Sequence, residues 1–156
     1  MRLPGPCDGR GPTLLALAVA SFTLAGTAAP AQSQPVGLNL SIERLRNDRG
    51  VLRICATRER KHFPDCSKDP SALRRSVPAS TVAVSFQGLK PGLYAISVLH
   101  DENGNGRMDT FLGVPREGFG FSGNAAPRFG PPSFEAAAIT IEAGVSHQTV
   151  RMRYLL

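Results

Sequence analysis

The chain has 156 residues and a formal net charge of +6 at neutral pH, with 18 basic and 12 acidic side chains. The basic residues concentrate between Arg44 and Arg75, where aspartates and glutamates are interleaved with them. A nucleic-acid-binding protein would instead show a concentrated basic face with aromatic or helical readers. We therefore expect no nucleic-acid partner. The charge predicts a solvated surface with at most weak contact with an anionic surface of the cell envelope.

The first 31 residues have the pattern of a secretory signal peptide. Arg2 and Arg10 precede a short apolar run at residues 14–24, and Ala29-Pro30-Ala31 then supplies an A-x-A cleavage pattern. Cleavage after Ala31 would leave residues 32–156 as one domain in the periplasm or outside the cell, and cleavage after Ala28 is the alternative. The mature chain would lose two arginines and one aspartate, which lowers its net charge to +5. No other segment is expected to span a membrane.

Two cysteines, Cys55 and Cys66, remain once Cys7 leaves with the signal peptide. In an exported protein an even pair favours a disulfide, which would stabilise the fold by about 2–3 kcal/mol in the chain-entropy model. Two independent thiols are the alternative. A metal-binding pair is less favoured because no second Cys/His pair stands at zinc spacing.

Apolar residues alternate with polar ones over short runs, which is the period of a β-strand. In chain order the runs cover residues 38–42, 50–57, 80–89, 93–100, 136–141 and 145–156. Lys90-Pro91-Gly92 has the chemistry of a turn, so the third and fourth runs are expected to form an antiparallel hairpin. Tyr94 and His100 should share one face of the fourth run, and both of its faces are apolar enough for a central strand.

Residues 110–133 lose this period and become rich in Gly, Pro, Phe and Arg. The density of phenylalanines predicts an ordered excursion packed on the domain. Short strands, frequent turns and no convincing helix indicate an all-β fold, an antiparallel β-sandwich of the prealbumin-like or immunoglobulin-like Greek-key kind.

The stretch "HDENGNGRMD", residues 100–109, carries the clearest chemical signal. Its spacing matches six features of an EF-hand calcium loop, with Gly106 at the sharp turn, but Leu112 stands where a bidentate glutamate is required. Glu117 or Glu135 could supply the missing carboxylate. The candidate ligands are Asp101, Asn103, Asn105, the carbonyl of Arg107, and Asp109. Calcium is thus the one cofactor that the residues indicate, and a tight turn with no metal is the alternative.

Two other functions remain open at this point, although we expect a non-catalytic module. His100, Asp101 and Asp109 could serve an envelope metal-assisted hydrolase, but neighbouring strand residues point to opposite faces, so His100 is more readily a structural residue. Arg116 and Arg128 lie among phenylalanines and could bind a carbohydrate or an anionic surface.

Three segments resemble a bacterial secreted family, domain of unknown function 2141. They are "HDENGNGRMDT", "LGVPREGFGFS" and "RFGPPSF", and the similarity extends over residues 50–154. "HFPDC" at residues 62–66 is similar to the variant of the family that carries a cysteine pair. The resemblance implies an exported β-sandwich-like domain and assigns no activity, substrate or catalytic residue.

Overall fold

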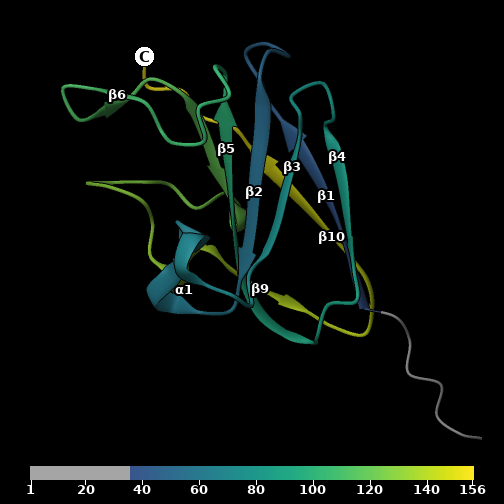
Figure 1. The fold of residues 1–156 in the computed structure, drawn as a ribbon. Helices are drawn as coiled ribbons and strands as arrows, with labels where there is room; N and C mark the ends of the chain where they lie inside the picture. Colours follow the sequence, from purple (N-terminus) through teal and green to yellow (C-terminus); the bar gives the residue numbers. More distant parts are fainter. Residues whose placement is uncertain (1–35) are drawn as a thin grey trace, which may run out of the picture. The chain divides into compact units, whose positions relative to one another are not determined.

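Residues 36–156 are described by the computed structural model, and they form two main β-sheets packed against each other and a small two-stranded sheet (Figure 1). The expected signal peptide lies outside the described residues. No helix in residues 36–156 is both long and apolar enough to cross a membrane. The prediction of an all-β sandwich is confirmed.

The smaller sheet has three strands in the order β10-β1-β4. Strand β1 (Val36–Glu43) pairs antiparallel with β4 (Ala83–Gln87) and parallel with β10 (Gly144–Arg151). The parallel pair departs from the antiparallel pattern that the sequence predicts. Such a pair needs a crossover connection, and here the whole of the intervening chain supplies it.

The larger sheet has the order β3-β2-β5-β8, and its central strand is β5 (Gly92–Asp101). Strand β2 (Val51–Thr57) separates β5 from β3 (Leu73–Pro78). On its other edge β5 pairs with β8 (Gly118–Phe121) along one half and with β9 (Ala138–Ile141) along the other. The sequence does not predict β3, because its arginines and serine obscure any alternation.

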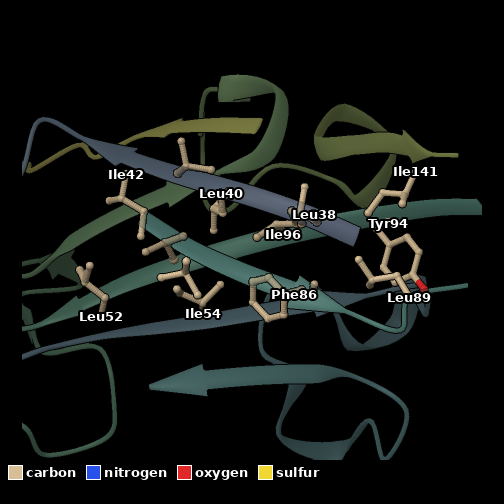
Figure 2. Close-up of a cluster of buried hydrophobic side chains, with 14 of the residues drawn as sticks. Leu38, Leu40, Ile42, Leu52, Ile54, Phe86, Leu89, Tyr94, Ile96 and Ile141 are labelled. Carbon is tan, nitrogen blue, oxygen red and sulfur yellow. The ribbon is translucent and has the colours of Figure 1, made fainter. Parts of the chain in front are cut away.

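The main core lies between the two sheets (Figure 2). Leu38 and Leu40 of β1 are fully buried and face residues of the other sheet such as Ile54 and Ile96. Each contributing strand places every second side chain in this layer, which is the alternation visible in the sequence. Tyr94, Ile96, Val98 and His100 are buried together on one face of β5, as expected.

The predicted hairpin between the third and fourth runs is wrong. Strand β4 pairs with β1 in the smaller sheet, whereas β5 pairs with β2, β8 and β9 in the larger one. Lys90-Pro91-Gly92 is therefore part of a connection between sheets. Phe86 and Ile96 meet across the core instead of standing side by side in one sheet.

Residues 110–133 contain more regular structure than their composition suggests. Strands β6 (Thr110–Phe111) and β7 (Val114–Pro115) form a two-stranded arm, and the short helix η3 (Ser122–Asn124) follows β8. Strand β8 shows no alternation of polar and apolar side chains, because glycines occupy every second position. A Cβ atom on Gly118 would lie 2.3 Å from the Tyr154 ring, and one on Gly120 would lie 2.5 Å from Val150.

A second, smaller cluster covers part of the outer face of β5. Phe119 and Phe121 pack there with Phe134 and Ala137 of the one-turn helix α1 (Phe134–Ala137), which occupies the start of the strand expected at residues 136–141. The segment after β2 also reaches this face through the short helices η1 (Arg60–His62) and η2 (Cys66–Lys68). Cys55 and Cys66 lie at disulfide distance, with their Cα atoms 6.2 Å apart, as predicted.

Candidate functional site

The loop at residues 101–109, called here the 101–109 loop, begins where β5 ends. Asp101 is the last residue of β5 and is fully buried. Its Oδ1 accepts the Asn105 N–H at 3.0 Å, and its Oδ2 accepts the Gly106 N–H at 2.8 Å. The Arg53 guanidinium donates to the same Oδ2 at 2.6 Å. Asp101 thus joins the loop to β2.

The loop's other oxygen-bearing side chains meet at Asp109. Asn103 and Asn105 donate to the two oxygens of the Asp109 carboxylate at 2.6 and 2.9 Å. The side-chain oxygens of these asparagines accept backbone N–H groups at Asn105 and Arg107. Gly106 has φ +86°, a conformation that suits glycine at this turn. The loop oxygens are therefore bound to N–H groups in this conformation.

Glu117 lies against the 101–109 loop, whereas Glu135 does not. The two Glu117 oxygens accept the Glu102 and Asp109 N–H groups, each at 3.0 Å, and the residue is buried. Glu135 instead pairs with Arg60 at 2.8 Å, beside η1. Of the two carboxylates that could compensate for Leu112, the fold brings only Glu117 to the loop.

Arg53 holds Asp101 in its charged form. Burial by itself would raise the pKa of Asp101, but the Arg53 guanidinium and the Gly106 N–H favour the charged form more strongly, so the pKa lies below its ordinary value. A cation that binds Asp101 must consequently compete with an arginine that is already in place. The sequence does not reveal this partner, which comes from a strand 48 residues away.

His100 points to the opposite side of β5 from Asp101. Its Nε2 lies 2.7 Å from the Arg49 carbonyl oxygen, and its Nδ1 lies 2.7 Å from Tyr154 Oη. Since a carbonyl only accepts, Nε2 carries a hydrogen. Tyr154 Oη also accepts the Arg46 N–H at 3.2 Å, which leaves its own hydrogen for Nδ1. The tyrosine had not been singled out from the sequence.

Arg46 connects this buried histidine to the end of the chain. Its guanidinium donates to Glu102 Oε1 and to the Leu156 carbonyl at 2.6 Å each, and to the Arg116 carbonyl at 2.9 Å. It also lies 4.6 Å from the centre of the Tyr154 ring. Burial by itself would raise the pKa of Glu102, but the bonds from Arg46 and Asn47, together with the positive charge of Arg46, lower it below its ordinary value. These contacts hold the C-terminal segment against the loop.

The residues expected for a hydrolase do not converge. His100 bonds to Tyr154 and Arg49 on the core side, whereas Asp101 bonds to Arg53 and to the loop amides on the other side. Within residues 36–156, no three His, Cys, Asp or Glu side chains are close enough together to hold a metal ion by themselves. The arrangement that metal-assisted hydrolysis requires is therefore not formed by these three residues.

The phenylalanines of residues 110–134 divide into two groups. Phe119, Phe121 and Phe134 are buried in the second cluster, whereas Phe111 and Phe129 are exposed. Phe111 belongs to the β6–β7 arm, which lies to the side of the end of β5 in Figure 1. Most of these rings therefore serve packing, and the two exposed ones lie in different loops.

Comparison with known proteins identifies a family over most of the chain. Residues 40–149, from β1 to β10, match a family model described as an uncharacterized protein conserved in bacteria (DUF2141). Neither the curated proteins nor the solved structures contain a match to the chain. Because the match covers most of the chain and both sheets, the protein belongs to this uncharacterised bacterial family, domain of unknown function 2141.

Proposed function

We propose that the protein is an exported, non-catalytic β-sandwich module whose 101–109 loop binds calcium weakly. The observation that supports this proposal is the position of Glu117, whose carboxylate lies against the 101–109 loop, although Asp101, Asp109 and Glu117 would have to move closer together to share an ion. Calcium takes six to eight oxygen ligands, and two asparagine side chains with a backbone carbonyl at Arg107 extend the set. Export follows from the signal-peptide pattern of the first 31 residues.

Binding should be weak because the ligands must first exchange partners. Asn103 and Asn105 would have to turn their side-chain oxygens toward the ion, since their amide nitrogens now face Asp109. Arg53 would also have to release Asp101, because its Nε lies 2.6 Å from Asp101 Oδ2 and its positive charge competes with the ion. We expect a dissociation constant on the order of 10⁻⁴–10⁻³ M, as in extracellular calcium modules.

The test is thermal unfolding of the protein with and without calcium. At about 10 mM calcium and a dissociation constant of about 1 mM, binding to the native state would raise the free energy of unfolding by about 1.4 kcal/mol. Glu117→Gln and Asp109→Asn should abolish this increase. Arg53→Gln should enlarge it, because it removes the competing charge from Asp101.

Two controls separate the loop from general ion effects. Glu135→Gln changes a carboxylate that pairs with Arg60 away from the loop, so it should leave the calcium response unchanged. Magnesium should stabilise the protein much less, because it demands a near-ideal octahedral site. The proposal is wrong if calcium leaves the midpoint unchanged in both the native protein and Arg53→Gln.

A further inference from the structure

We propose that a groove on the outer face of the larger sheet binds a single-chain anionic amphiphile, such as a long-chain carboxylate. The groove has a volume of about 980 Å³. Its size suits a small ligand rather than a folded partner. The inference rests on the proposed function only in taking the protein as a non-catalytic binding module, and it is independent of the calcium proposal.

The floor of the groove is set by strand register. Arg53, Leu99 and Phe119 stand opposite one another on β2, β5 and β8, so their side chains share one face. The next row contains Arg74 of β3, then Cys55, Ser97 and Phe121. In both rows an arginine of β2 or β3 stands on one side and a phenylalanine of β8 on the other, and Ser76 of β3 stands next to Arg53. All of these residues line the groove.

The walls come from loops that are held to this floor. The segment at residues 64–67 forms one wall, and it is tied down by the Cys55–Cys66 pair and by the Ser97 hydroxyl, which donates to the Pro64 carbonyl at 2.8 Å. Met108 and Val114 line the groove from the 101–109 loop and from β7. The groove is therefore preformed, with an apolar strip along part of its length.

The charge of the lining is one-sided. Five arginines line the groove, and Asp65 is the one acidic residue among its lining residues. The Asp65 carboxylate already accepts the N–H and the hydroxyl of Ser67. Arg75 stands opposite Ile54, on the core side, and its guanidinium lies 6.0 Å from the Phe86 ring. The other four are Arg53, Arg74, Arg107 and Arg128.

Of the four arginines that do not face the core, Arg74 and Arg128 have no acidic partner within the described part of the chain. Arg74 donates to the Asp69 carbonyl at 2.6 Å. A cation beside an apolar strip is complementary to an anionic head attached to an apolar chain. The head would bind near Arg74, on the β3 side of the floor, and the chain would run along Leu99 toward Met108 and Val114.

The test is calorimetric titration with sodium dodecanoate below its critical micelle concentration, in EDTA so that calcium plays no part. We expect saturable binding by the folded protein at one site. Arg74→Gln should weaken binding about threefold to tenfold, as expected for a partly exposed charge-assisted bond. Leu99→Asp should abolish it by placing a carboxylate on the floor.

The controls assign the binding to the groove. Arg151→Gln removes the same charge from β10, where Arg151 pairs with Glu43 outside the groove, and should bind dodecanoate normally. Acetate has the charge without the long chain, and dodecyl maltoside has the chain without the charge. Each should bind at least tenfold more weakly than dodecanoate. The inference is overturned if dodecanoate does not bind, if Arg151→Gln weakens its binding as much as Arg74→Gln does, or if binding occurs only to anionic vesicles. A calcium response without dodecanoate binding would overturn this inference alone.

Discussion

Tyr154→Phe tests the buried connection between His100 and the C-terminal segment. The substitution removes only the hydroxyl that lies 2.7 Å from His100 Nδ1 and 3.2 Å from the Arg46 nitrogen. His100 is fully buried, so its Nδ1 would lose its partner in a place that water does not reach. Leaving one buried polar group unpaired costs about 1–3 kcal/mol. For roughly 120 residues, this corresponds to a fall in melting temperature of about 4–12 °C.

The assay is urea unfolding followed by far-ultraviolet circular dichroism, with Tyr94→Phe as the matched control. Tyr94 is also buried, but its hydroxyl accepts only the Lys90 N–H, at 3.3 Å. The control should therefore lose less than about 1 kcal/mol. The reasoning fails if the free energy of unfolding of Tyr154→Phe lies within about 0.3 kcal/mol of that of the native protein. It also fails if Tyr94→Phe lowers this free energy as much as Tyr154→Phe does.

Two further predictions concern strand β8 and the segment after β2. Gly120→Ala places a Cβ 2.5 Å from Val150 and should cost about 1–3 kcal/mol in urea unfolding, whereas Gly37→Ala meets mainly the end of the flexible Gln87 side chain and should cost less. The pKa of Asp69 is lowered to about 2, chiefly by bonds from Ser71 and Thr57. Its stabilising contribution is present above the unfolded pKa of about 3.8 and is lost as the pH falls toward 2, so Asp69→Asn should flatten acid unfolding over that range.

Local alternation was sufficient to locate most strands, because the sandwich core is a layer that every second side chain enters. Leu38 and Leu40 follow this pattern, as do Tyr94 and His100. The same rule misses β3 and β8. In β8, glycines at positions 118 and 120 alternate with Phe119 and Phe121, and from the sequence alone such glycines indicate turn or loop residues.

Pairing between strands was beyond the reach of local pattern. The hairpin expected around Lys90-Pro91-Gly92 is absent from the described sheets, because β4 and β5 face each other across the core. The parallel pairing of β1 with β10 joins segments about 100 residues apart. Turn chemistry shows where a chain can reverse, but it does not decide which sheet the next strand joins.

The 101–109 loop shows the same division between local and long-range information. Its glycine turn and its alternating oxygen-bearing side chains are properties of adjacent residues, so the sequence by itself determined them. The sequence likewise determined that His100 faces the core and that Cys55 and Cys66 pair. Only the tertiary structure decided that Glu117 lies against the loop while Glu135 does not. It also decided that Arg53 neutralises Asp101 and that arginines gather beside an apolar groove. The physical reason is that these contacts join residues brought together by strand register across the larger sheet, and a periodic pattern within one segment carries no information about its neighbours.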